Sequence, residues 1–378
     1  MKLVYCISSY QAFGGIEVVT SLKANALSKA EDYRVWLLDS ETPSAVPGLS
    51  SSNVEQIELG IRYKTVVSRF PINLLVRLMK MFKHRRLIKK ELMRIQPDIV
   101  ISVGEEKFFL PFIKGSWKTI REIHFPKNQR QRFEQKKTVS RWVSKLGDWL
   151  EYDVVCKKYD QVVILTEEDK RTNWGNNKNL SVIPNPSRFR PDSPSCLKEK
   201  RILSIGRLAF EKNFASLIRA FSLVSKRFPD WQLDIYGEGP EYSSLLSEIN
   251  SFGLMGRTNL KGTSSDIQKE MLSSSIFVLS STFEGFSLVL LEALSCGLPV
   301  LSYSCPYGPK EIISNGVNGF LVPLNDEIAL AELICQLIAD ESLRQRIGAG
   351  AYEFSKNYVL ENIIKQWMAL FNMLLHAQ

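Results

Sequence analysis

The sequence predicts an α/β protein made of two doubly wound domains. Short apolar runs alternate with longer amphipathic segments, and this alternation restarts after residues 184–200, a stretch rich in Pro, Ser and charge. Strands separated by helices favour a parallel sheet that is covered on both faces. The length of 378 residues is enough for two domains that each bury a core.

The first half of the chain has the pattern of an N-terminal domain over residues 1–190. Strands are expected at 3–8, 33–38, 98–103, 118–123 and 161–165. Helices are expected at 15–30, 72–95 and 135–158. The stretch 184–200 has the composition of a linker.

The second half repeats the pattern and predicts a C-terminal domain over residues 191–359. Strands are expected near 201–205, 231–236, 258–261, 276–280, 298–302 and 319–322, and helices near 213–227, 240–250, 287–296 and 326–338. An apolar stripe predicts a last helix at 360–375, and we expect residues 360–378 to pack back on the N-terminal domain. Ligands of doubly wound sheets bind beyond the carboxyl ends of the strands, so two facing domains would hold a ligand in the cleft between them.

Composition narrows the classes of partner. The net charge of +9 favours an anionic partner, which can be a nucleotide, a nucleic acid or an acidic membrane surface. The six cysteines have no C-x-x-C spacing and there are only three histidines, so we expect no metal site and reduced, cytoplasmic thiols. No apolar run approaches eighteen residues, and the first residues read as a strand rather than a signal peptide.

The most informative stretch holds two glutamates, Glu284 and Glu292. Glu284 follows the strand near 276–280 and precedes Gly285, and Glu292 lies in the apolar helix that comes next. Acidic residues eight apart are commonly solvated, but a charge within an apolar helix is rarely buried without a partner or a function. Backbone amides at the helix start form an anion site, and they belong to Phe286, Ser287 and Leu288.

Two cations follow the first strand of the second half. Arg207 and Lys212 flank a short loop between Gly206 and the next helix. Arg offers a planar fork to phosphate oxygens and Lys a point charge, so the two can neutralise a diphosphate without a metal ion. The alternative is a solvated loop with two ordinary cations.

These residues together resemble glycosyltransferase family 4, whose members have the GT-B fold and retain the anomeric configuration. The resemblance covers nearly the whole chain, and it rests on the order and spacing of several motifs rather than on any one. Those motifs are Glu284 and Glu292 with seven residues between them, Gly206-Arg207-Leu208 with Glu211-Lys212-Asn213, Ile183-Pro184-Asn185, Gly14-Gly15-Ile16-Glu17, Arg121-Glu122-Ile123-His124, Thr166-Glu167-Glu168 and residues 315–322.

The resemblance implies a role for each matching position. Arg207 and Lys212 would bind the donor diphosphate, Glu292 the ribose hydroxyls and Glu284 the donor sugar. His124 would lie near the anomeric centre, so the implied catalytic residues are His124, Arg207, Lys212 and Glu284. The other implied donor-binding positions are Gly14, Gly15, Gly262, Thr263, Gly285, Phe286, Ser287 and Leu288.

The segment 302–313 resembles a subgroup that uses UDP-hexoses or UDP-N-acetylhexosamines in bacterial surface polysaccharide assembly, including lipopolysaccharide. The expected reaction is a retaining, metal-independent transfer from a UDP-sugar to a saccharide acceptor, lipid-linked, with no further cofactor. No Asp-x-Asp motif of the metal-dependent type is present. The alternatives are another GT-B enzyme, such as a UDP-sugar epimerase or a glycosyl phosphorylase, an inactive partner subunit, and a basic nucleic-acid-binding protein, which no motif supports.

A basic segment at residues 62–94 suggests contact with a membrane. It holds eleven Lys or Arg against Glu91 alone, and a second basic stretch with nearby aromatic residues runs over 127–145. Basic amphipathic helices with aromatic residues suit an anionic membrane surface, so we expect peripheral association with the inner face of the cytoplasmic membrane. The alternative is a helix that packs its apolar stripe on the sheet, and both can hold at once. The stripe consists of Leu74, Leu78, Met81, Ile88, Leu92 and Ile95.

Overall fold

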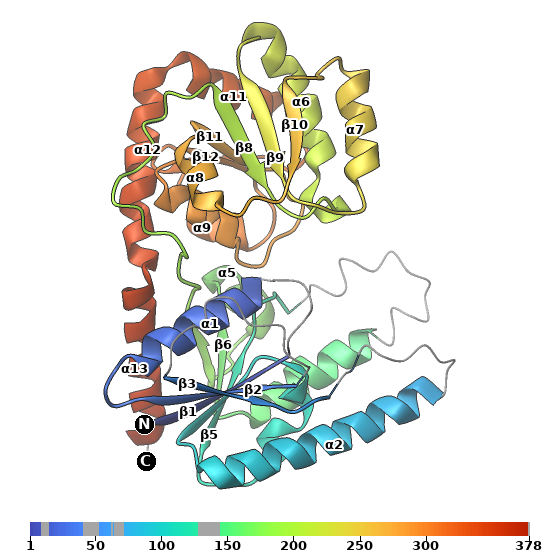
Figure 1. Ribbon diagram of the computed structural model, residues 1–378, viewed down its shortest axis with the longest axis vertical. Helices are drawn as coiled ribbons and strands as arrows, with labels where there is room; N and C mark the ends of the chain where they lie inside the picture. The colour runs from blue at the N-terminus through green and yellow to red at the C-terminus, as the bar shows by residue number, and fades with distance from the viewer. Residues whose placement is uncertain (9–14, 41–52, 62, 64–71, 128–143, 377–378) are drawn as a thin grey trace. The chain divides into compact units, whose positions relative to one another are not determined.

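The computed structural model divides the chain into two compact units (Figure 1). One unit comprises Met1–Pro184 with Leu360–Gln378, and the other comprises Asn185–Val359. The prediction placed this boundary after residue 190. The structure describes residues 1–8, 15–40, 53–61, 63, 72–127 and 144–376.

The N-terminal unit is built on a seven-stranded sheet in which every strand pair is parallel. The strand order reverses between β1 and β4. From one edge to the other the strands are β3 (Val54–Glu58), β2 (Arg34–Asp39), β1 (Lys2–Ile7), β4 (Ile99–Ser102), β5 (Lys118–Glu122), β6 (Gln161–Ile164) and β7 (Leu180–Val182). The two edge strands, β3 and β7, were not predicted.

Alternating side chains of these strands serve two separate cores. Leu3 and Tyr5 of β1 face helices α1 (Gly15–Ser28) and α13 (Leu360–His376), which contact each other. Val4 and Cys6 face the other side, where helix α2 (Ile72–Ile95) supplies Ile88, Leu92 and Ile95. This period of two is what a strand buried on both faces requires.

The connections that follow β4 and β6 are short and irregular. The 3-10 turns η1 (Glu105–Phe108) and η2 (Leu110–Phe112) follow β4, and α5 (Glu167–Asp169) with η5 (Lys170–Trp174) follows β6. The helix expected at 135–158 is described only from residue 144. There it continues as a π-helix, η3 (Trp149–Val155), and a 3-10 turn, η4 (Cys156–Lys158), and residues 135–143 lie outside the described part of the chain.

The C-terminal unit is a six-stranded parallel sheet, and its order reverses between β8 and β11. The strands are β10 (Thr258–Gly262), β9 (Gln232–Tyr236), β8 (Arg201–Ile205), β11 (Ile276–Leu279), β12 (Val300–Tyr303) and β13 (Gly319–Val322). The helices are η6 (Phe210–Lys212), α6 (Phe214–Arg227), α7 (Tyr242–Ser251), α8 (Ile267–Leu272), α9 (Leu288–Ser295), α10 (Gly308–Ile312), α11 (Glu327–Ala339), α12 (Glu341–Ser355) and η7 (Lys356–Tyr358). The predicted fold class is confirmed, although α8, α10 and α12 were not expected.

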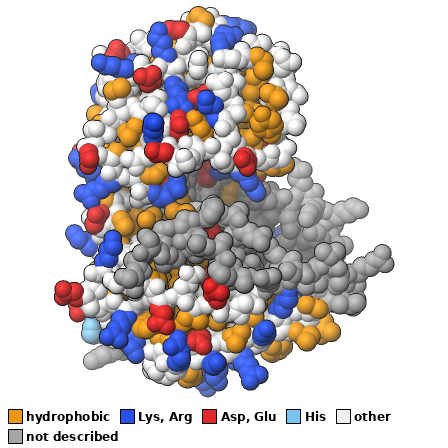
Figure 2. Space-filling view, in the orientation of Figure 1, with side chains coloured by type: hydrophobic (Ala, Val, Ile, Leu, Met, Phe, Trp, Pro, Cys, Tyr) orange, Lys and Arg blue, Asp and Glu red, His pale blue; other side chains and the backbone are white. Residues whose placement is uncertain are grey.

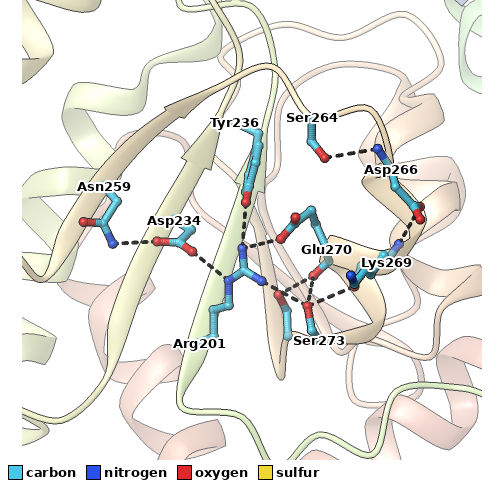
Figure 3. A network of polar contacts seen from close by, with 10 residues as sticks. Arg201, Asp234, Tyr236, Asn259, Ser264, Asp266, Lys269, Glu270 and Ser273 are labelled. Atoms are coloured by element: carbon cyan, nitrogen blue, oxygen red, sulfur yellow. Dashed lines mark hydrogen bonds and ion pairs between the residues drawn. The ribbon is translucent and has the colours of Figure 1, made fainter.

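A polar network fastens α8 to the sheet (Figure 3). Arg201, the first residue of β8, donates to Asp234 of β9 at 2.7 Å, to Glu270 of α8 at 2.7 Å and to the Tyr236 hydroxyl at 3.0 Å. Asn259 of β10 donates to the second oxygen of Asp234 at 2.7 Å. The guanidinium of β8 therefore joins β9 to α8, and Asp234 extends the network to β10.

Candidate functional site

The predicted donor residues gather at the point where the strand order of the C-terminal sheet reverses. Lys212 ends η6, which follows β8, and Glu284 lies in the loop after β11. Two hydrogen bonds join these segments: Thr282 donates its N–H to the Glu211 carbonyl at 2.9 Å, and the Ser280 hydroxyl donates to the Lys212 carbonyl at 2.8 Å. Open α/β sheets bind ligands at such a switch point.

Lys212 and Glu284 form an ion pair there. The ammonium lies 2.7 Å from Glu284 Oε1, which also accepts a hydrogen bond from Ser281 at 2.7 Å. The two side chains are 21% and 10% exposed, so the pair is partly open to solvent. An ammonium in this position can turn to a phosphate, and the carboxylate can accept hydroxyl hydrogen bonds.

Arg207 is placed differently from Lys212. Its side chain is 69% exposed, and it donates to Glu211 at 2.6 Å rather than to Glu284. Burial opposes ionisation of Glu211, but the hydrogen bond from Arg207, a backbone hydrogen bond and the charges of Arg207 and Lys212 together outweigh it and lower the pKa of Glu211. The structure therefore brings Lys212 and Glu284 together, and it leaves Arg207 as an exposed arm beside them.

Glu292 lies inside the unit on α9, and its side chain is 2% exposed. Burial raises its pKa, and an ion pair with Arg188 opposes that rise in part. Sequence reasoning missed Arg188. A carboxylate in an apolar helix indicates a cationic partner, but no local sequence pattern identifies one that lies 104 positions earlier in the chain.

The start of α9 has the features of an anion site. The helix begins after Ser287, whose hydroxyl does not cap it and is buried without a hydrogen-bond partner among the described residues. Amides of a first helical turn have no acceptor within the helix. A Cβ at Gly308 would lie 3.0 Å from the Gly285 carbonyl oxygen and 3.1 Å from the Ser287 nitrogen, so glycine there lets α10 approach this loop closely.

Gly262 and Thr263 follow the end of β10. Gly262 has a φ of +68° and accepts the Gly237 N–H at 2.7 Å. A Cβ at Gly237 would lie 1.9 Å from the Gly206 carbonyl oxygen, which only glycine avoids. The ends of β8, β9 and β10 are thus packed backbone to backbone, and the predicted base-contacting residues come directly after them.

The N-terminal unit has a cavity of about 430 Å³ at its own switch point. Ile7 and Ser8 after β1, Gly15 at the start of α1, and Val103 after β4 line it. His124, which follows β5, lines it as well. Gly14 lies outside the described residues.

Charged side chains also line this cavity. Lys107 lies 2.8 Å from Glu151, and the buried Arg121 lies 3.5 Å from the same carboxylate. Arg121 also donates to the Ser102 carbonyl at 3.0 Å. Both signs of charge and several hydrogen-bonding groups therefore face one cavity, which suits a ligand rich in hydroxyl groups.

Comparison with known proteins assigns the class of the C-terminal unit. The family described as Glycosyl transferases group 1 matches residues 187–354. The chain is 38% identical over 224 residues to an exopolysaccharide phosphotransferase of Streptomyces coelicolor, covering 57% of this chain and 23% of that protein. It is 33% identical over 222 residues to the amylovoran biosynthesis glycosyltransferase AmsD of Erwinia amylovora, covering 56% and 62%. The chain thus spans less than two thirds of either relative.

A solved structure matches both units. HepE of Anabaena in complex with UDP and glucose has a TM-score of 0.75 and 18% identity, covering 98% of this chain and 99% of that one. The chain therefore carries a glycosyltransferase group 1 domain within a GT-B fold, as the resemblance predicted. None of the helices described is long and apolar enough to cross a membrane.

Proposed function

We propose that this chain is a retaining glycosyltransferase that moves a hexose or N-acetylhexosamine from a UDP-sugar to a saccharide acceptor in polysaccharide assembly. The observation that carries the proposal is the Lys212–Glu284 pair beside the start of α9, at the switch point of the group 1 domain. AmsD, named for the biosynthesis of a polysaccharide, and HepE, bound to UDP and glucose, support the substrate classes.

The chemistry follows from where charge develops. As the bond from the anomeric carbon to the diphosphate breaks, negative charge grows on the departing UDP. Lys212, the exposed arm of Arg207 and the amides at the start of α9 stabilise that charge without a metal ion. The acceptor oxygen forms its bond on the same face of the sugar, and its proton passes to the departing phosphate oxygen.

Glu284 and Glu292 hold hydroxyl groups in this scheme. Glu284 can accept hydrogen bonds from the donor sugar, since the donors to it among the described residues, Lys212 and Ser281, share one oxygen, Oε1. Glu292 would take the ribose, with Arg188 fixing the direction of its carboxylate. Neither residue acts as a nucleophile, because same-face transfer needs no covalent intermediate.

A donor screen tests this function. The purified chain is incubated with a panel of UDP- and GDP-sugars and a lipid-linked saccharide acceptor, with and without EDTA, and nucleotide release is measured. Release from a UDP-sugar that needs acceptor, survives EDTA and gives a product with the donor's anomeric configuration supports the proposal. Isomerised UDP-sugar without acceptor identifies an epimerase, and loss of activity with EDTA contradicts the metal-independent scheme.

We propose further that α2 brings the N-terminal unit to an anionic membrane carrying the acceptor. The C-terminal half of α2 packs on the sheet through Ile88 and Leu92, but its N-terminal half leaves Leu75, Met79 and Phe82 at 62%, 64% and 70% exposure. Basic residues of the same helix lie around them, and Figure 2 shows blue and orange side chains intermingled along the lower edge, where α2 lies in Figure 1. Exposed apolar groups among cations suit anionic lipid.

Vesicle co-sedimentation tests the docking of α2. The double variant Met79→Ser/Phe82→Ser should bind phosphatidylcholine vesicles with added phosphatidylglycerol about tenfold more weakly, because two apolar side chains no longer leave water. Phe252→Ser/Met255→Ser, which alters two exposed apolar residues of the other unit, is the matched control. Equal binding by both variants, or binding indifferent to anionic lipid and salt, contradicts the docking.

A further inference from the structure

A buried ion pair lies behind His124 in the N-terminal unit. Lys23 of α1 pairs with Glu122, the last residue of β5, and each side chain is 1% exposed. The Lys23 ammonium also lies 4.6 Å from the centre of the Trp367 ring on α13. Removing two charges from water costs free energy that their attraction does not always return, so such a pair is weak evidence of a purely stabilising role.

The same carboxylate touches His124. Glu122 Oε1 lies 3.2 Å from His124 Nε2, although the angle falls outside hydrogen-bond geometry. His124 Nε2 and Glu122 Oε2 are both closed to solvent and have no hydrogen-bond partner in the described part of the chain. One edge of the imidazole is therefore turned to Glu122, while the residue also lines the 430 Å³ cavity.

The charge state of Glu122 suits it to act on the ring. Burial would raise its pKa, but Lys23 and His124 outweigh burial and lower the pKa of Glu122 to about 2. The carboxylate is thus ionised at neutral pH, and the Lys23 ammonium balances its charge. An anion beside one nitrogen of a histidine favours the proton on that nitrogen and leaves the other nitrogen as an acceptor.

We infer that Lys23 and Glu122 are positioning residues for His124: Glu122 lies against Nε2 and holds the ring proton there, Lys23 balances the charge of the carboxylate, and Nδ1 is left as an acceptor. This assignment rests on the proposed function, because it deepens the role of a residue of that site. An acceptor nitrogen suits a hydroxyl group of a sugar. Trp367 closes the far side of Lys23, so α13 takes part in the arrangement.

Other charges surround the same cavity and belong in the electrostatic account. Glu17 of α1, Glu105 and Lys107 of η1, Arg121 of β5 and Glu151 of η3 all line it. Lys107 and Arg121 both lie close to Glu151, whose carboxylate balances part of their positive charge. Among the charged groups described, it is the Glu122 carboxylate that lies against the His124 ring, 3.2 Å from Nε2.

Nuclear magnetic resonance of the ring nitrogens tests the inference without any need for activity. The full chain has three histidines, so long-range proton–nitrogen spectra of the ¹⁵N-labelled protein are tractable, and His124→Gln assigns the His124 signals. The wild type should carry the proton on Nε2. At one fixed pH, Glu122→Gln should mix the tautomers and lower the protonated fraction, whereas Lys23→Met should raise that fraction.

Opposite movements by the two variants are the signature of positioning, since a loss of packing alone has no reason to change sign. Lys29→Met, beyond the end of α1, is the matched control and should leave the signals unchanged. If Lys23→Met does not fold, Glu122→Gln removes a charge isosterically and carries the test. Unmoved signals, or movement in the same direction by both variants, overturn the inference.

A kinetic measurement then separates this inference from the proposed function. With the best UDP-sugar, Glu122→Gln should lower kcat by about 10–100-fold with little change in the donor KM, and Glu122→Asp should restore part of it. A wild type that transfers no sugar defeats the proposed function, while the spectra still decide the positioning of His124. Full activity of a folded Glu122→Gln variant overturns the inference and leaves the function standing.

Discussion

Each unit places an ion pair at the carboxyl end of its parallel sheet, but the two pairs differ in their exposure to solvent. In the C-terminal unit, Lys212 and Glu284 are 21% and 10% exposed, and a serine hydroxyl shares the carboxylate. In the N-terminal unit, Lys23 and Glu122 are 1% exposed each, and an indole and an imidazole lie on either side. The first pair is open to a ligand, whereas the second is sealed inside the core.

This difference separates two uses of charge. A partly solvated pair can exchange partners at small cost, so Lys212 and Glu284 are able to contact substrate directly. Neither residue of a buried pair can move away from the other without leaving an unpaired charge in the core. Lys23 and Glu122 can therefore act only through His124, which contacts Glu122 and lines the cavity. Substitutions at equivalent members of the pairs should therefore affect different measurements.

The largest expected effect is on stability, at the sealed pair. Lys23→Met leaves a buried carboxyl group without its cation, so the free energy of unfolding of the N-terminal unit should fall by about 3–5 kcal/mol. Urea unfolding followed by tryptophan fluorescence measures it. Lys212→Met should cost under about 1 kcal/mol in the same experiment. Equal losses for the two variants would remove the distinction between them.

The next effect is on the rate, at the open pair. Lys212→Ala should lower kcat by about 10²–10³-fold, because an ammonium that stabilises the departing diphosphate is lost. Lys226→Ala, at an exposed position in the last turn of α6, is the control for the loss of one positive charge. If both variants lose the same activity, net charge rather than position explains the result.

The fold was largely predictable from the sequence, and the reason lies in its buried strands. Segments such as β8 (Arg201–Ile205) and β11 (Ile276–Leu279) are short apolar runs next to turn residues, so their pattern predicts them. The edge strand β3 (Val54–Glu58) is half exposed and carries two glutamates, so its sequence did not indicate a strand. The region 9–14, with Gly14, lies outside the described residues.

The partners of the site residues were far less predictable. Motif spacing indicated Lys212 and Glu284 separately, but the sequence alone did not show that they pair across 72 positions. Glu122 was noted only as a neighbour of His124, and its cation lies 99 positions earlier. Charge pairing across such separations depends on which helices and strands the fold brings together, and no local sequence pattern indicates that. The roles of these residues in catalysis stay predictions.

Acid titration sharpens the comparison through Glu122. Its pKa is lowered in the folded state from 4.5 to about 2, so its stabilising contribution is complete above pH 4.5 and is lost as the pH falls toward 2. The loss should reach roughly 1.4 kcal/mol by pH 3.5. Glu122→Gln should therefore approach the wild type in unfolding free energy as the pH falls over this range.

Glu292 provides the opposite sign in the same titration. Its pKa is raised by burial, so protonation favours the folded state and its contribution grows as the pH falls. As the pH falls, the wild type should therefore gain stability relative to Glu292→Gln, whereas it should lose stability relative to Glu122→Gln. Parallel curves for wild type and Glu122→Gln from pH 7 to pH 3.5 would mean that Lys23 does not hold that carboxylate ionised.

The smallest expected effect belongs to Arg207, the exposed arm next to the open pair. The Arg207 side chain is 69% exposed, so its ion pair with Glu211 contributes little to stability. Arg207→Ala should therefore change the unfolding free energy by under about 1 kcal/mol. If Arg207 binds the donor diphosphate through one charge-assisted hydrogen bond, its loss should raise the donor KM by about tenfold, ~1.4 kcal/mol, with kcat within about twofold.

Arg207→Lys decides how Arg207 binds. A lysine keeps the charge but not the planar fork, so a rescue of KM to near the wild-type value shows that charge alone suffices. A KM as high as that of Arg207→Ala shows that the fork geometry is needed. A fall in kcat as large as that of Lys212→Ala would instead place Arg207 with Lys212 in stabilising the transition state, and exposure would then not distinguish the two cations.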